Sequence, residues 1–331
     1  MLKVGLLGAG RIGQVHARTI AAHPRSQLHS ISDVNGEAAG ALAAPYGAEV
    51  RSTEAILADS AIDAVLIATS TDTHSDLIEA AVRAGKAVLC EKPVDLSLKR
   101  ARACLAVVRE CGKPVMIGFN RRFDPNFAKL KAAFEAGEIG KGELLSITSF
   151  DPAPPPVSYI KVSGGLFRDM TIHDFDMACW IMGAAPEKVS ATGSSIVDPA
   201  IGEAGDMDTA VIVLQYADGR IVAIKNSRRA AYGYDQRVEL LGSEGLLSAR
   251  NMLEHTVEKL SAEGALTAKP EHFFLERYAR AYVAEWNAFV EAILDGAPIP
   301  VSLEDGINAL AVADAATQAA RSGQSVAVQG A

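Results

Sequence analysis

Residues 1 to about 120 alternate short apolar runs with amphipathic stretches. This alternation is typical of a parallel β-sheet that carries helices on both faces. Gly85 and Gly112 follow two of the amphipathic stretches, at the position where glycine commonly ends a helix. The pattern predicts strands at residues 3–7, 28–32, 64–67, 87–89 and 115–117, and helices at residues 12–22, 38–46, 53–58, 75–84 and 98–111.

The pattern changes near Asn120, and strand signals dominate much of the rest of the chain. We therefore predict an α/β protein with a doubly wound parallel sheet at residues 1–120 and a second α/β domain at residues 121–331. The second domain is expected to hold an open, mostly antiparallel sheet of about six strands. One face should carry helices, and a second subunit should cover the other, because an open apolar face is a liability.

The elements expected in the second domain follow from the same patterns. A turn at residues 217–220 joins two strands, and a stiff proline-rich loop occupies residues 151–156. The helix at 303–321 is expected to pack back onto the first domain. The predicted strands are residues 144–150, 189–193, 210–216, 221–227, 237–241 and 246–249. The first predicted helix opens at residues 121–125 and runs to about residue 136, and the other two cover residues 272–294 and 303–321.

A glycine-rich turn follows the first predicted strand. Gly8, Gly10 and Gly13 fit the spacing G-x-G-x-x-G, with a strand before them and a helical pattern after them. Gly8 permits the tight turn, Gly10 lets a pyrophosphate approach the backbone, and Gly13 lets the helix pack closely on the strand. The helix start, at Arg11 and Ile12, offers free N–H groups to the phosphates. A purely structural turn is the competing interpretation.

Asp33 ends the second predicted strand. An acidic side chain about 20 residues beyond such glycines accepts hydrogen bonds from the adenosine ribose hydroxyls. A carboxylate would repel a 2′-phosphate, and Val34 and Asn35 offer no guanidinium to receive one. The sequence therefore predicts NAD rather than NADP.

Two further loops follow predicted strands and should lie at the carboxyl edge of the sheet, where ligands bind in open α/β folds. Thr69, Thr71 and His74 belong to the first loop, which can cap a helix and still line the cofactor. Glu91 and Lys92 begin the second loop. Lys92 is either a solvent-exposed lysine or a group that faces the nicotinamide.

Asp169 and His173 stand at positions i and i+4 in the second domain. If this stretch is helical, the two side chains share one face, and the carboxylate orients the imidazole as a general base. The alternative is an acidic residue at a helix start and an unrelated histidine. Asp174 and Asp176 are expected to face solvent or to cap the helix.

Composition narrows the choice of partners. A net charge of −8 without a basic run disfavours nucleic acid and anionic membranes. No apolar run is long enough to span a bilayer, and the first residues lack the apolar span of a signal peptide. The four cysteines show no C-x-x-C spacing, which favours reduced thiols in a cytoplasmic protein. We predict no metal site.

These landmarks together resemble the Gfo/Idh/MocA family of NAD(P)-dependent oxidoreductases, and within it the inositol 2-dehydrogenases. The resemblance covers essentially the whole chain, although Ser70 stands where many relatives carry proline. It implies a Rossmann domain that binds NAD, a homotetramer, and a catalytic group formed by Lys92, Asp169 and His173. The matching stretches are GLLGAGRIGQVHA, TDTH, CEKPVDL, GFNRRFDP, GGLFRDMTIHDFDMA and NSRRAAYGYDQRVELLGSEG.

The resemblance implies oxidation of a ring hydroxyl of myo- or scyllo-inositol to the inosose by hydride transfer. An aldose (pyranose) 1-dehydrogenase is the alternative, and an NAD-dependent sensor or glycosidase are more distant ones. Arg121 and Tyr234 are substrate candidates chiefly from the resemblance, and Asp151 from its place at a strand end. The full set for substrate is Lys92, Arg121, Asp151, Asp169, His173 and Tyr234, and for cofactor Gly8, Gly10, Arg11, Ile12, Gly13, Asp33, Thr69, Thr71, His74, Glu91 and Lys92.

Overall fold

The computed structural model describes residues 1–329, which form two compact units. The first unit comprises Met1–Asn120 and Ala281–Leu310, and the second comprises Arg121–Arg280 and residues 311–329. The last two residues of the predicted second domain lie outside the described part of the chain. No helix within residues 1–329 is both long and apolar enough to cross a membrane.

The first unit holds a six-stranded sheet whose strands are all parallel, as predicted. The strand order is β3-β2-β1-β4-β5-β6, so the order reverses between β1 and β4. In such sheets ligands bind beyond the carboxyl ends of the strands at this reversal. The strands are β1 (Leu2–Leu7), β2 (Ser26–Ser32), β3 (Glu49–Val50), β4 (Ala64–Ile67), β5 (Ala87–Glu91) and β6 (Val115–Gly118).

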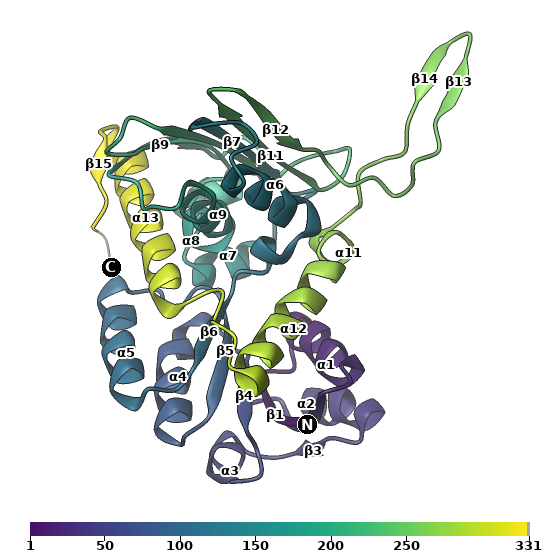
Figure 1. The fold of residues 1–331 in the computed structure, drawn as a ribbon, viewed down its shortest axis with the longest axis vertical. Coiled ribbons are helices and arrows are strands. Elements are labelled where there is room, and N and C mark those ends of the chain that lie inside the picture. Colours follow the sequence, from purple (N-terminus) through teal and green to yellow (C-terminus); the bar gives the residue numbers. More distant parts are fainter. Residues whose placement is uncertain (330–331) are drawn as a thin grey trace. The chain divides into compact units, whose positions relative to one another are not determined.

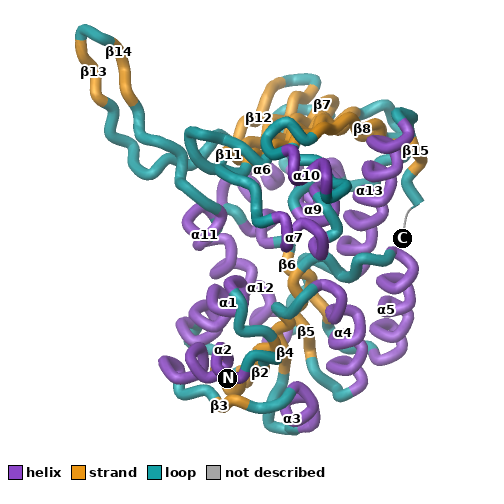
Figure 2. The backbone as a smooth tube through the Cα atoms, turned by 180° about the vertical axis from the view of Figure 1, so that it is seen from behind, coloured by secondary structure: helices purple, strands orange, loops and turns teal. Residues whose placement is uncertain are grey.

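Helices flank this sheet, as Figures 1 and 2 show. Gly112 ends one of them in the left-handed conformation, at φ 62°, as its position in the sequence predicted. The predicted helix at 38–46 is shorter, because Pro45 cannot donate to a helical hydrogen bond and a 3₁₀ turn follows. The flanking helices are α1 (Arg11–Ala22), α2 (Gly36–Ala43), α3 (Thr53–Ala58), α4 (His74–Arg83) and α5 (Leu98–Cys111).

The predicted helix at 272–294 is in fact two helices. These are α11 (Phe274–Arg277) and α12 (Ala279–Asp295), which are separated at Tyr278. Hydrophobic periodicity does not detect a break of one residue, because the apolar positions continue across it. From Ala281 onward α12 belongs to the first unit, where Trp286 donates a hydrogen bond of 3.0 Å to the hydroxyl of Ser26.

The second unit holds a seven-stranded sheet in the order β12-β11-β7-β10-β9-β8-β15. All its neighbouring strands are antiparallel except β7 and β10, which confirms a mostly antiparallel sheet. The seventh strand, β15, has only two residues and was not predicted. The strands are β7 (Gly142–Phe150), β8 (Lys188–Ser194), β9 (Thr209–Gln215), β10 (Ile221–Ser227), β11 (Asp235–Gly242), β12 (Gly245–Ala249) and β15 (Val326–Ala327).

One face of this sheet is buried and the other is open. Figure 1 shows α9 beneath the sheet, where strand residues such as Ile147, Ile212 and Ile224 are fully buried. Residues 151–156 form no helix or strand, consistent with the predicted loop. The helices of the second unit are α6 (Pro125–Glu135), α7 (Val157–Ser163), α8 (Leu166–Asp169), α9 (Ile172–Met182), α10 (Pro199–Glu203), α11 and the later part of α13 (Leu303–Ser322).

A two-stranded hairpin extends away from the sheet of the second unit (Figures 1 and 2). Its strands are β13 (Lys259–Ser261) and β14 (Gly264–Leu266), and all their residues are exposed. The sequence did not predict this hairpin, because three residues are too few for a recognisable alternation.

Candidate active site

The three glycines of the turn after β1 have separate structural environments. Gly8 has φ +105°, and a Cβ there would lie 2.4 Å from the carbonyl oxygen of Ala68. A Cβ on Gly13 would lie 2.1 Å from the carbonyl oxygen of Gly8, so glycine permits the close packing of α1. Gly10 is exposed, and a Cβ there would meet nothing within 4 Å. Gly10 therefore faces open space at the start of α1, where a pyrophosphate has room to approach.

The Asp33 carboxylate is joined to this turn. One oxygen accepts a hydrogen bond of 2.6 Å from the N–H of Ala9, and the other accepts one of 2.8 Å from Asn35. Each oxygen keeps a further lone pair, which suits the hydroxyls of a ribose. Val34, beside it, is fully exposed, an apolar surface that no sequence pattern indicated. Three features together fit NAD: Gly10 is open, the start of α1 has no side-chain cap, and Asp33 places a carboxylate at the end of β2.

His74 holds the loop after β4 in place. Its Nδ1 lies 2.8 Å from the carbonyl oxygen of Pro93, and its Nε2 lies 3.2 Å from that of Thr69. The ring is buried, and this burial lowers its pKa, although both carbonyls act in the opposite direction. The imidazole thus links the first loop to the segment that follows Lys92, and its contacts are to the backbone.

Glu91 is fixed from the opposite side. Its Oε1 lies 2.7 Å from Nε2 of His16, a buried residue of α1. Lys92 therefore leaves the sheet between two anchored neighbours, Glu91 and Pro93. The sequence did not single out His16 as a partner of Glu91, because their pairing depends on α1 packing beside β5.

The chain between α8 and α9 is not one continuous helix. Asp169 ends α8, and His173 lies in the first turn of α9 after a break at Met170 and Thr171. The single helix assumed for Asp169 and His173 is thus interrupted by two residues, although Met170 and Thr171 both keep right-handed helical backbone angles. Both side chains are half-buried.

Two residues that the sequence did not single out bind the Asp169 carboxylate. The hydroxyl of Tyr159 donates to Oδ1 at 3.0 Å, and Nη2 of Arg228 lies 3.3 Å from Oδ2. The preceding residue, Arg168, donates through Nε and Nη2 to Oδ1 of Asp314 on α13, at 3.0 and 2.6 Å. These bonds fix both the end of α8 and the direction of its last carboxylate.

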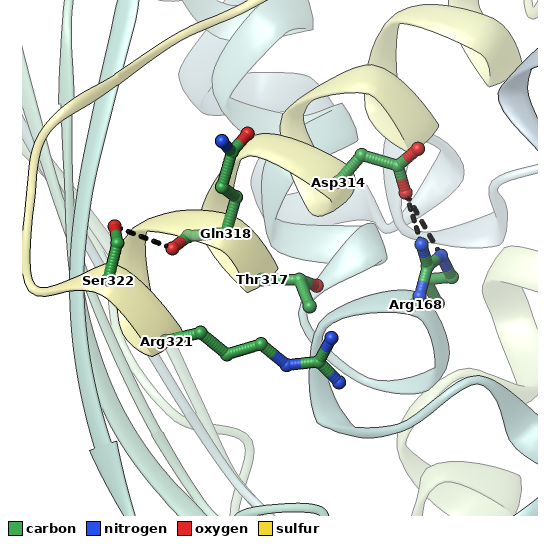
Figure 3. A pocket seen from close by; sticks show the side chains of 6 residues that line it. All are labelled: Arg168, Asp314, Thr317, Gln318, Arg321 and Ser322. Atoms are coloured by element: carbon green, nitrogen blue, oxygen red, sulfur yellow. Dashed lines mark hydrogen bonds and ion pairs between the residues drawn. The ribbon is translucent and has the colours of Figure 1, made fainter.

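Figure 3 shows the Arg168–Asp314 pair at one side of a surface cavity of about 460 Å³. None of the predicted catalytic side chains lines this cavity. We therefore do not assign it as the active site, despite its size. Its lining comes from α8 and α13: Arg168, Asp314, Thr317, Gln318, Arg321 and Ser322.

Asp174 and Asp176 do not face solvent, and that expectation was wrong. Asp174 is fully buried and binds Nη1 of Arg121 at 2.6 Å and the amide of Asn226 at 2.8 Å. Asp176 forms two bonds with Arg122, at 2.9 and 2.6 Å. A carboxylate away from water needs such partners, because burial alone penalises its charge. Burial does raise the pKa of Asp174, although Arg121 opposes the rise.

Three predicted substrate residues gather around this network. Arg121 and Tyr234 are buried, with Nη2 of the arginine 3.5 Å from the tyrosine hydroxyl. Asp151 is half-buried, and burial raises its pKa to about 6. Arg228 and Arg121 oppose this rise, whereas the carboxylates of Asp169 and Asp174 add to it. Arg121 thus serves first as the counter-ion of Asp174.

A parallel sheet with a glycine-rich turn and an acidic end to its second strand is typical of a dinucleotide-binding domain, a class found in many oxidoreductases. Two family models match the chain in agreement with this class: "Oxidoreductase family, NAD-binding Rossmann fold" at residues 2–119 and "Oxidoreductase family, C-terminal alpha/beta domain" at residues 131–328. The chain belongs to the Gfo/Idh/MocA oxidoreductase family, and its first unit is an NAD-binding Rossmann domain.

Similar proteins span the whole chain. The inositol 2-dehydrogenase of Rhizobium meliloti (strain 1021) is 51% identical over 318 residues, which are 96% of each chain. The structure of a myo-inositol dehydrogenase from Corynebacterium glutamicum ATCC 13032 is 44% identical, covers 100% of both chains and has a TM-score of 0.95. The structure of a scyllo-inositol dehydrogenase from Lactobacillus casei, with bound NAD(H) and scyllo-inositol, is 30% identical, covers 99% of both chains and has a TM-score of 0.93.

Gly10 and Gly13 make a matched pair of test positions for the cradle. Gly10→Ala should change the unfolding free energy by less than about 1 kcal/mol, because the new methyl group has space. It should raise the Kd for NAD about tenfold or more, because the methyl occupies the phosphate approach. Gly13→Ala should destabilise the fold by about 1–3 kcal/mol through overpacking. Urea unfolding and fluorescence titration with NAD measure both effects; equal NAD affinity in Gly10→Ala and wild type would contradict this assignment.

Asp151→Asn tests the raised pKa of Asp151. An acid whose folded pKa lies above its unfolded value favours folding below the unfolded pKa and loses that contribution as pH rises through the folded value. The unfolding free energy of Asp151→Asn, minus that of wild type, should therefore grow from pH 4.5 to pH 7.5. Urea unfolding at three pH values measures it, with the exposed Glu143→Gln on β7 as the control. A difference independent of pH would show that burial does not shift Asp151.

Proposed function

We propose that this protein catalyses the NAD-dependent oxidation of a ring hydroxyl of myo- or scyllo-inositol to the inosose. Family membership over both halves of the chain supports the reaction class. The names of the similar proteins support the substrate class, and the Lactobacillus casei relative binds both NAD(H) and scyllo-inositol. In this chain the proposal depends on one observation: the glycine turn after β1 is open at Gly10 and is bonded to the carboxylate of Asp33.

We propose that the first unit holds the cofactor through Gly8, Gly10, Gly13 and Asp33, and that the second holds the polyol. When bound, NAD supplies the hydride acceptor. The neutral imidazole of His173 accepts the proton of the reacting hydroxyl. The remaining predicted cofactor contacts are Arg11, Ile12, Thr69, Thr71, His74, Glu91 and Lys92, and the predicted polyol contacts are Lys92, Arg121, Asp151, Asp169, His173 and Tyr234.

In this proposal Asp169 orients the imidazole of His173, and Lys92 donates a hydrogen bond to the oxygen that loses its proton. Such a donor steadies the negative charge that develops on the oxygen. Tyr159 and Arg228 hold the Asp169 carboxylate, so it orients its neighbour from a fixed position. The chain's residues therefore supply position, proton acceptance and charge, and leave redox chemistry to the cofactor.

His173→Ala and Lys92→Ala test these assignments. His173→Ala should lower kcat by about 10²–10⁴-fold, the usual value of a general base, with the Kd for NAD unchanged. Lys92→Ala should lower kcat far more than it weakens NAD binding. NADH formation is measured by absorbance with myo-inositol, scyllo-inositol and D-glucose, and the exposed His255→Ala is the control. Near wild-type turnover in His173→Ala removes this residue from the chemistry, and turnover of D-glucose alone identifies an aldose 1-dehydrogenase.

We further propose a cytoplasmic homotetramer that uses the open face of the sheet in the second unit. Four apolar side chains stand in one row across neighbouring strands and are exposed in the single chain: Leu246, Leu241, Leu144 and Ile221. Contiguous apolar surface of this kind on a sheet marks an interface between proteins. The buried thiols Cys90 and Cys104 suit a reducing compartment.

The double variant Leu144→Lys/Ile221→Lys should disrupt the tetramer, because two charges would be buried in its interface. Sedimentation velocity measures the mass at several concentrations. Val50→Lys, which changes an exposed valine of the first unit, is the control and should leave the mass unchanged. A tetramer that persists in the double variant would show that another surface joins the subunits.

A further inference from the structure

Asn226 is a buried amide on β10, at a position where the strand pattern favours an apolar residue. Val222, Ile224 and Asn226 are buried, and the residues between them are exposed or half-buried. Only 1% of Asn226 is exposed. An amide in such a place costs free energy unless both its oxygen and its nitrogen are hydrogen-bonded. The partners of Asn226 therefore indicate what the amide is for.

Both ends of this amide bind the beginning of α9. Its Nδ2 donates to Oδ2 of Asp174 at 2.8 Å, and its Oδ1 accepts a hydrogen bond of 2.7 Å from the hydroxyl of Thr171. Both partners are fully buried. They stand on either side of His173 in the chain, two residues before it and one residue after it. One side chain thus holds both sides of the turn that carries the proposed general base.

The chemistry of the partners permits one orientation of the amide. An ionised carboxylate only accepts hydrogen bonds, so the NH2 group of Asn226 must face Asp174. The amide oxygen then faces Thr171, whose hydroxyl must donate. Nη1 of Arg121 and the hydroxyl of Ser149 each lie 2.6 Å from the other oxygen of Asp174, which fixes the carboxylate. The direction of every bond at Asn226 therefore follows from the buried carboxylate.

Thr171 lies at the N-cap of α9, where a threonine hydroxyl usually accepts a hydrogen bond from the helix. Here its side chain makes no such bond. The hydroxyl is directed at Asn226 instead, and its other acceptor, the carbonyl of Leu166, is more distant at 3.3 Å. The carbonyl of Thr171 accepts from the N–H of Asp174 at 2.8 Å. Because the first turn of α9 starts from this carbonyl, a fixed Thr171 fixes the backbone of His173.

We propose that Asn226 is a positioning residue for His173 and acts through its bonds to Thr171 and Asp174. Asp169 orients the imidazole in the reaction proposed above, whereas Asn226 places the backbone from which that imidazole extends. This inference rests on the proposed role of His173 as the general base. The placement of the histidine can also be measured without any turnover.

Single-turnover kinetics separates positioning from general stability. With NAD limiting and inositol saturating at pH 9, misplacement of His173 lowers the rate constant of NADH formation, whereas a misfolded fraction lowers only its amplitude. Thr171→Val, which removes one hydroxyl, and Asn226→Leu, which removes both bonds, should each lower the rate constant about tenfold or more. Thr171→Ser retains the hydroxyl and should stay within about twofold of wild type. Wild-type rate constants in Thr171→Val and Asn226→Leu, or a loss of amplitude alone, would overturn the proposal.

Two further variants make the test specific. Thr19→Val is the matched control, because it also removes a buried hydroxyl, one that donates to the carbonyl of Val15 on α1 at 3.0 Å, and it should keep the wild-type rate constant. In a His173→Ala background, Asn226→Leu should have little further effect, because the group that it misplaces is already absent. A full additional loss in this double variant would show that Asn226 does not act through His173.

The inference and the proposed function fail in distinguishable ways. If wild type forms no NADH from either inositol, the proposed function fails, and crystal structures of wild type and Thr171→Val still test the inference. A displaced first turn of α9 in the variant supports it, and an unmoved His173 contradicts it. If Asn226→Leu does not fold, as thermal unfolding would reveal, the comparison of Thr171→Val with Thr171→Ser decides the question.

Discussion

The cofactor-binding part of the molecule depends on the close approach of α1 to the turn that follows β1. Gly13 packs so tightly on the carbonyl of Gly8 that any side chain at this position would displace the main chain. The N–H of Gly8 also binds the carbonyl of Ser32 at 2.8 Å, next to Asp33. The turn, the start of α1 and the end of β2 are therefore held together, and Gly10 lies on the side that is open to a ligand. A preorganised cradle of this kind binds an anion without an ordering cost.

Buried charge organises the second unit in the same way that close packing organises the first. Arg121 and Arg122 are adjacent in the chain, and they bind Asp174 and Asp176 on α9. Removing one partner of such a pair leaves an uncompensated buried charge. The two pairs therefore restrict α9 to the position in which both aspartates reach their arginines. His173 immediately precedes Asp174 and stays half-buried rather than buried. The two ion pairs thus fix the part of α9 that carries His173.

Local patterns were sufficient to predict the longer strands of the two large sheets, most helices and the glycine turn, because these elements depend on periodicity and on backbone requirements at particular glycines. The cradle was predicted residue by residue, and Gly8, Gly10 and Gly13 each have the environment expected of them. Pairings between distant residues could not be predicted. Arg121 and Asp174 are 53 residues apart, and nothing in the sequence around Asp174 indicates a buried partner. The interruption between Asp169 and His173 was missed for a different reason: two residues are too few to alter the helical spacing on which that prediction relied.

The proposed role of Lys92 depends on the same kind of long-range pairing. A lysine side chain has a flexible four-carbon stem, so the position of its ammonium also depends on how firmly the backbone that carries it is held. Accuracy must come from the backbone, and here two histidines hold it: His16 through Glu91 and His74 through Pro93. Each pairing joins residues that are distant in the sequence, 75 residues apart for His16 and Glu91 and 19 for His74 and Pro93, so no local pattern around Lys92 indicates them.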